Sequence, residues 1–148
     1  MKHVSQTAKK VVDKLVADLD NPGDAKTFDA HNYTEKWDGG IMAVHVENIG
    51  HIKSTGNGNL YSITHYYKQN GDMIRDPEMI FWGGKMANKK AELIDTYYPI
   101  YFRQDPMVEE ESVVFEEGEC KGYRRAMQAD HARFANTWMK NIKEQQNL

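Results

Sequence analysis

The acidic side chains between residues 72 and 78 have the types and spacing of a metal-dependent active site. Asp72, Asp76 and Glu78 follow His65 closely in the chain. Asp76 and Glu78 are two residues apart, so a regular strand would place both carboxylates on one face of a sheet. Two carboxylates and a histidine could hold Mg²⁺ or Mn²⁺ for phosphodiester chemistry. His65, Asp72, Asp76 and Glu78 are therefore candidate catalytic residues, with His65, Asp76 and Glu78 as candidate metal ligands.

The position of these side chains depends on a predicted hairpin. Asn70-Gly71 is the strongest hairpin signal in the chain, because a type I′ turn needs positive φ at both central residues. A turn centred there pairs Gln69 with Asp72 and brings His65 near Asp76.

A structural explanation of the same acids stays open. Asp76 could cap the turn before Pro77, and Glu78 could pair with Arg75 or Arg103. No lysine stands two residues after Glu78, which weighs against a nuclease built on an Asp-x-Glu pair.

A second group of candidate binding residues ends an aromatic segment. Arg103 follows Tyr101 at strand spacing and precedes Asp105. Arg103 could clamp a phosphate or a carboxylate. The alternative is a salt bridge from Arg103 to Asp76 or Glu78, since arginine beside acids on a sheet usually pairs internally.

Several common sites are absent from the sequence. It contains no CxxC, HExxH, Walker A, GxGxxG or GxSxG pattern. The histidines fall on different predicted elements, which argues against zinc. We expect no cofactor, apart from Mg²⁺ or Mn²⁺ if the acidic cluster is catalytic. The lone Cys120 fits a reducing cytosol.

Charge is segregated along the C-terminal part of the chain. Residues 105–119 hold seven acidic side chains and no Lys or Arg, whereas residues 121–148 carry a net charge of +4. The two segments could pair within the chain, or be solvated surface. The acidic segment could instead imitate a phosphate backbone, or the basic helix could touch nucleic acid. Aromatic residues 97–102 could stack on single-stranded bases, although core packing is their commoner role.

The elements that position these residues follow from hydrophobic periodicity. At 148 residues the chain predicts one domain, residues 1–148. The pattern predicts an N-terminal helix over 4–19 with Ser5 as N-cap, a sheet region over 38–117 and a C-terminal helix over 123–146. Strands are predicted at 41–49, 60–69, 72–82, 93–104 and 108–115. This order predicts an α+β fold, in which helices cover one face of a mainly antiparallel, five-stranded meander.

Three other segments have specific expectations. Pro77 lacks a backbone N–H, so its strand should be an edge strand, bulged, or regular only from Glu78. Pro99 likewise suggests an edge or a break. Residues 20–37 are expected to form an irregular connection, and residues 83–90 a basic loop.

Composition limits the functional classes. The net charge of −3 argues against a wholly basic polyanion binder but allows a local basic face. No signal peptide and no run of about 20 apolar residues is present, so we expect a soluble cytoplasmic protein without membrane contact.

Three segments together resemble a known family. They span residues 65–79, 97–105 and 134–146, and contain the patterns HYYKQNGDMIRDPEM, YYPIYFRQD and FANTWMKNIKEQQ. The combination, over roughly residues 38–148, is similar to a family of small bacterial proteins known only as a domain of unknown function. The resemblance implies a protein of plasmids, phages or conjugative elements, and it implies no activity.

The sequence therefore favours a non-enzymatic accessory protein of a mobile genetic element that binds a protein or nucleic-acid partner. The alternative is a divalent-metal-dependent phosphodiesterase or nuclease using His65, Asp76 and Glu78. A third hypothesis is a structural homodimer without a ligand.

Overall fold

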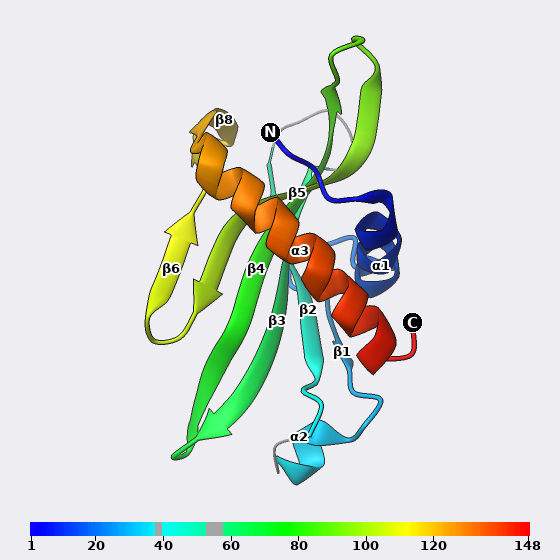
Figure 1. Cartoon of the computed structure of the whole chain (residues 1–148), viewed down its shortest axis with the longest axis vertical. Helices are drawn as coiled ribbons and strands as arrows, with labels where there is room; N and C mark the ends of the chain where they lie inside the picture. The colour runs from blue at the N-terminus through cyan, green and yellow to red at the C-terminus, as the bar shows by residue number, and fades with distance from the viewer. Residues whose placement is uncertain (38–39, 53–57) are drawn as a thin grey trace.

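The fold is α+β, with one large antiparallel sheet and helices at both ends of the chain (Figure 1). The computed structural model describes residues 1–37, 40–52 and 58–148. The elements are α1 (Gln6–Val16), β1 (Ala25–Phe28), α2 (Tyr33–Lys36), β2 (Val44–His51), β3 (Asn59–Gln69), β4 (Asp72–Ala87), β5 (Leu93–Gln104), β6 (Val108–Glu111), β7 (Val113–Glu116), β8 (Glu119–Tyr123) and α3 (Arg125–Gln145).

The predicted fold class is confirmed, but the predicted strand number is wrong. The large sheet has six strands in the order β1-β2-β3-β4-β5-β6, and β7 and β8 form a separate two-stranded sheet. Residues 25–28, expected in an irregular connection, pair with β2 as a four-residue edge strand. The predicted strand 108–115 divides at Ser112 between the two sheets. Short strands like these carry too few alternating residues for a sequence signal.

The two terminal helices lie on the same face of the sheet (Figure 1). Ser5 caps α1 as predicted, because its Oγ accepts a hydrogen bond from the Ala8 N–H at 3.1 Å. The helix ends at Val16 rather than residue 19, although Leu19 is still buried. In α3 the buried face includes Trp138 and Ile142 as expected, but Phe134 is 40% exposed.

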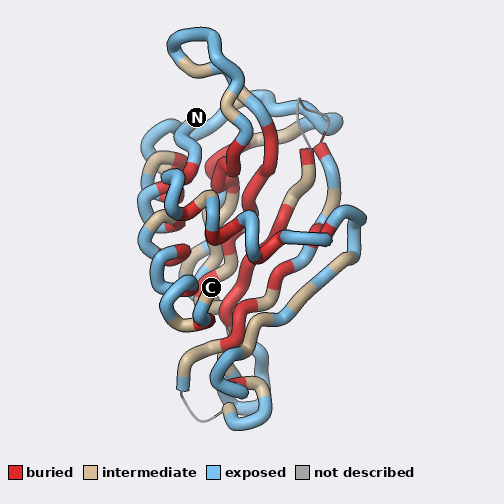
Figure 2. The backbone as a smooth tube through the Cα atoms, turned by 90° about the vertical axis from the view of Figure 1, so that its right-hand side faces the viewer, coloured by how far each residue is buried: buried red, intermediate tan, exposed pale blue. Residues whose placement is uncertain are grey.

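The main core lies between the helices and the sheet, and buried positions follow its strands (Figure 2). Successive residues of a strand point to opposite faces, so alternate apolar residues meet the helices. The largest fully buried side chains of this core are Leu15, Ile63, Met79, Phe81, Met139 and Ile142. A second apolar cluster, formed by Trp82, Tyr98, Ile100 and Val113 with Phe115, links the sheet to β7.

The β3–β4 hairpin has the predicted turn and an irregularity beside it. Asn70 and Gly71 have φ values of 51° and 85°, and Gln69 pairs with Asp72, as expected. The register then changes between Thr64 and Tyr66, so that two residues of β4, Asp76 and Pro77, oppose His65. This confirms the bulged alternative for Pro77.

The other two expectations for this region have mixed outcomes. β5 lies inside the sheet with a register shift between Ile80 and Phe81, so Pro99 occupies an irregular position rather than an edge. The predicted loop at 83–90 is wrong, since β4 continues to Ala87 and pairs with β5 up to Leu93.

Replacement of Phe81 by Ala tests this core. Phe81 is 0% exposed, so Phe81→Ala should lower the free energy of unfolding by about 3–5 kcal/mol through lost burial and a cavity. The matched control is Phe134→Ala, which should cost about 1 kcal/mol because that ring is already half exposed. Equal losses in urea unfolding would contradict the placement of these rings.

Candidate functional site

The bulge in β4 gives the two carboxylates of the predicted cluster different partners. Glu78 accepts hydrogen bonds from the hydroxyls of Ser62 at 2.7 Å and Thr64 at 3.4 Å. Asp76 instead accepts one from the Gln104 side-chain amide at 2.5 Å. An inserted residue breaks the alternation of side chains, so the regular-strand geometry that would put both acids together does not apply.

Glu78 belongs to a network of ions on the sheet. Its Oε1 lies 3.7 Å from Arg75 Nε. Arg75 also reaches Asp105, with 3.3 Å between Nη1 and Oδ2. Arg103 donates from Nε to the other Asp105 oxygen at 2.7 Å. We expected Arg103 to form a salt bridge with Asp76 or Glu78. That prediction is wrong, because Arg103 pairs with Asp105 instead.

Asp105 is held as a carboxylate by this network. The Arg75 backbone N–H, at 3.0 Å from Oδ2, and the Arg103 guanidinium lower the pKa of Asp105 against the opposing effect of burial. Tyr101 hydrogen-bonds Arg103, and burial followed by Glu109 and Glu78 raises the pKa of Tyr101. Arg103, Asp105 and Tyr101 thus lie together but satisfy one another.

His65 is a buried, neutral side chain on the helix side of the sheet. It is 5% exposed and meets Trp138 edge-on, with ring centroids 5.3 Å apart. Trp138 Nε1 donates to His65 Nδ1 at 3.3 Å. Burial is the main cause that lowers the pKa of His65 to about 4. The nearby Asp76 carboxylate acts to raise this pKa, and His45 acts to lower it.

The predicted metal site is not assembled. Asp72 is exposed beside the turn, while His65, Asp76 and Glu78 have the separate partners given above. Among residues 1–37, 40–52 and 58–148, no group of three or more His, Cys, Asp and Glu side chains could hold a metal ion. The nuclease hypothesis stays a prediction, and these residues contain no group of side chains that could coordinate its metal ion.

The structure brings together a Glu-His-Ser group that the sequence patterns did not predict. His131 Nδ1 lies 2.9 Å from Ser112 Oγ, and Nε2 lies 3.0 Å from Glu110 Oε1. Ser112 is 0% exposed, so its hydroxyl cannot meet a substrate without rearrangement. The contact links α3 to the β6–β7 junction. The available signal was His131 at the polar interruption of an apolar helical stripe.

Most of the segregated charge does not pair across the two segments. Among the described residues, one ion pair joins the two segments, Lys121–Glu119 at 3.5 Å, and His131 Nε2 lies 3.0 Å from Glu110 Oε1. Arg124 reaches the backbone carbonyl of Glu111 rather than a carboxylate. Exposed acids therefore surround β6 and the β7–β8 turn, and among the described residues most basic side chains of residues 121–148 have no acidic partner in residues 105–119.

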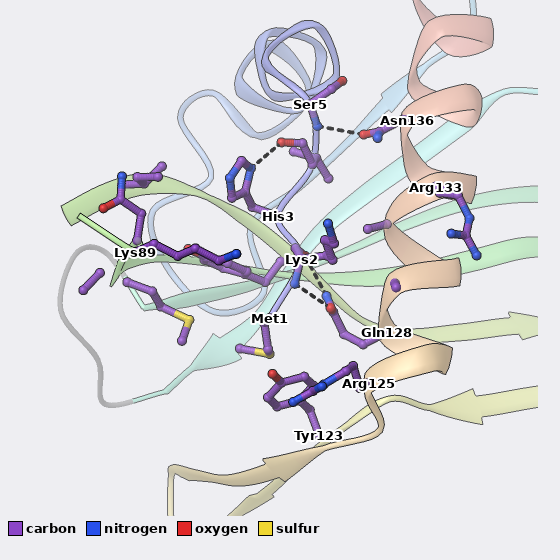
Figure 3. A pocket seen from close by; sticks show the side chains of 18 residues that line it. Met1, Lys2, His3, Ser5, Lys89, Tyr123, Arg125, Gln128, Arg133 and Asn136 are labelled. Atoms are coloured by element: carbon purple, nitrogen blue, oxygen red, sulfur yellow. Dashed lines mark hydrogen bonds between the residues drawn. The ribbon is translucent and has the colours of Figure 1, made fainter. Parts of the chain in front are cut away.

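Two basic side chains of α3, Arg125 and Arg133, join Lys2 and Lys89 around a hollow of about 880 Å³, which we call the basic hollow. It lies between the N-terminal segment, the β4–β5 hairpin and the first three turns of α3 (Figure 3). Its lining comprises Met1, Lys2, His3, Val4, Ser5, Met86, Ala87, Asn88, Lys89, Ile94, Tyr98, Tyr123, Arg125, Gln128, Ala129, Ala132, Arg133 and Asn136. None of these residues is acidic.

The N-terminal wall of the basic hollow is fixed by hydrogen bonds. The buried Gln128 accepts from the Lys2 backbone N–H at 2.7 Å and donates to the Lys2 carbonyl at 2.7 Å. Ser5 N–H donates to Asn136 Oδ1 at 2.8 Å, and Val4 N–H donates to the Tyr97 carbonyl at 3.0 Å. Lys2 therefore projects from ordered backbone.

Replacement of His65 by Gln tests its neutral state. A folded-state pKa below the usual 6.5 means that stability is fully present above pH 6.5 and is lost as pH falls towards about 4. This loss should total roughly 3 kcal/mol in the wild type and be absent in His65→Gln. Urea unfolding across this range measures it, and an imidazole that titrates by NMR near pH 6.5 would contradict it.

Replacement of Asp105 by Asn tests the arginine network. The variant should lose about 1–3 kcal/mol at neutral pH, because both arginines lose a charged acceptor. Since the folded-state pKa of Asp105 lies below 3.8, wild-type stability should fall as pH drops below that value, and the variant should lack this component. Identical acid unfolding curves would show that the network is not formed.

Comparison with known protein families assigns the chain to one family. None of the helices in the described ranges is both long and apolar enough to cross a membrane. No curated protein and no solved structure matches the chain. Residues 11–148 match the family described as Domain of unknown function (DUF6908). This match begins earlier than residue 38, the limit of the resemblance in sequence, and it includes part of α1. The chain belongs to this uncharacterised domain family.

Proposed function

We propose that this DUF6908 protein is a non-enzymatic accessory binding protein, and that single-stranded nucleic acid occupies its basic hollow. The observation that carries the proposal is a hollow with basic side chains around an apolar floor and no acidic lining residue. Nucleic acid has the matching combination of phosphate charges and flat apolar bases.

Electrostatics favour a polyanion at this position. No ion pair is recorded for the Lys2, Lys89 or Arg125 side chains among the described residues, so they are available to phosphates. Arg133 contributes less, because it pairs with Asp130. The exposed acids of β6–β8 would repel a strand that bound there, and would thereby orient it towards the basic hollow.

The shape and lining of the hollow favour a single strand. Tyr123 is 41% exposed and lies beside Arg125 at the edge of the hollow (Figure 3). Met86, Ile94 and Tyr98 add apolar surface. An exposed aromatic ring next to a basic groove is the usual arrangement for stacking unpaired bases. Tyr98 itself is 2% exposed and packs in the second apolar cluster, so Tyr123 rather than the aromatic segment 97–102 offers a ring for stacking here.

The cellular setting is part of the same proposal. The motifs at residues 65–79, 97–105 and 134–146 support an origin on a plasmid, phage or conjugative element. The composition supports a single cytoplasmic domain, and a homodimer is compatible with it.

The nuclease alternative is distinguished by cleavage. It requires His65, Asp76 and Glu78 to converge on Mg²⁺ or Mn²⁺, whereas their contacts lie with Trp138, Gln104 and Ser62, respectively. We expect a labelled strand to bind and stay intact when either ion is added. Cleavage that is lost in Asp76→Asn would favour the alternative.

Charge reversal tests the proposed interface. The triple variant Lys2→Glu, Lys89→Glu and Arg125→Glu should weaken binding of a fluorescein-labelled oligothymidine by at least about 100-fold, since three phosphate contacts are lost. The slope of log K against log salt should also fall by roughly 2. Fluorescence anisotropy at several salt concentrations measures both quantities.

A matched control separates site binding from net charge. Lys10→Glu, Lys14→Glu and Lys140→Glu change the net charge equally, but these exposed side chains lie outside the basic hollow. The control should bind within a few-fold of wild type. Equal loss in both triples, tighter binding to a duplex of the same length, or no binding by wild type would refute the proposal.

A further inference from the structure

A second hollow, of about 490 Å³, lies on the opposite side of α3 from the basic hollow. Its apolar surface comes from Ile41, Met42, Pro77 and Trp138. The polar groups that line it are His65 and the amide side chains of two residues from the last turns of α3, Asn141 and Gln145. Its size is within the range of small-molecule sites, which combine apolar walls with a few polar groups.

His65 has one ring nitrogen without a partner. Trp138 Nε1 can only donate, so the hydrogen bond to His65 Nδ1 makes that nitrogen an acceptor. In a neutral imidazole the proton must then be on Nε2. Nε2 is buried and has no hydrogen-bond partner among the described residues. A buried N–H without an acceptor is costly, and a ligand acceptor that enters from the hollow, with a small movement of the side chains around Nε2, would satisfy it.

The surroundings select a neutral ligand. The described residues that line this hollow include no Lys, Arg, Asp or Glu that could serve as the counterion of a buried charge. The Asp76 carboxylate is close enough to act on His65, and it disfavours an anion. His45 acts on His65 in the opposite direction, and its own pKa is lowered by burial, so it adds little positive charge. A cation is disfavoured because His65 presents a hydrogen towards it.

We propose that this hollow is a binding site for a neutral heteroaromatic molecule of the nucleobase type. A carbonyl oxygen or ring nitrogen of the ligand accepts the His65 Nε2 hydrogen, and its flat apolar surface packs among Trp138, Pro77 and Met42. The amides of Asn141 and Gln145 each offer a donor and an acceptor to the remaining polar edge. This site and the basic hollow share no lining residue, so each can be altered by substitution without changing the lining of the other.

NMR with ¹⁵N-histidine and ¹⁵N-tryptophan labels tests the site directly. Uridine and adenosine are the probes, and at least one should shift His65 Nε2 and the Trp138 indole N–H in a saturable manner. Indole, a flat heterocycle whose nitrogen only donates, should bind about tenfold more weakly. Uridine monophosphate should bind more weakly than uridine, since the described lining of the hollow offers no Lys or Arg to its phosphate.

Two variants separate the contact from folding. His65→Phe keeps an aromatic ring but removes the donor, and should weaken nucleoside binding about tenfold. Asn141→Ala removes an exposed amide from the hollow, leaves the core intact and should weaken binding several-fold. If neither nucleoside shifts His65, if both variants bind like wild type, or if uridine monophosphate binds more tightly than uridine, the proposal is wrong.

Discussion

The structure depends on how β3 pairs with β4, and in particular on the extra residue that β4 carries opposite His65. Side chains alternate along a strand, so one inserted residue changes which face each later side chain meets. Between the turn and the bulge, the register of the two strands follows from the Asn70-Gly71 turn. On the far side of the bulge, Thr64 pairs with Glu78. The insertion accounts for the separation of Glu78, in the arginine network, from Asp76, beside Gln104. It also places Pro77 next to the His65–Trp138 pair.

This constraint explains why the fold was more predictable than the site. The fold class, the Ser5 cap and the Asn70-Gly71 turn each rest on local chemistry that a few neighbouring residues express. The bulge was one of three alternatives for Pro77, and sequence alone could not choose among them, because Pro is compatible with all three. Without the bulge, Asp76 and Glu78 look like a metal-binding pair.

The basic hollow could not be predicted for a different reason. Lys2, Lys89 and Arg125 are far apart in the sequence, and none of them belongs to a motif. The packing of α3 against the N-terminal segment, through Gln128 and Asn136, brings Lys2 and Arg125 to one hollow, and the β4–β5 hairpin adds Lys89. The charge segregation in the sequence left open whether the acidic and basic segments pair with each other or form separate surfaces. The structure adds that, among the described residues, the Lys121–Glu119 ion pair and the His131–Glu110 contact link acidic and basic side chains of the two segments.

The location of the nucleic-acid interface is best tested by mapping backbone amide shifts in the ¹⁵N-labelled protein as a short oligothymidine is added. We expect the largest changes in residues 2–5, 88–90 and 123–129, around the basic hollow, and we expect salt to reverse them. Changes confined to residues 109–119 or to the β3–β4 turn would contradict the proposed interface, as would a spectrum that does not change.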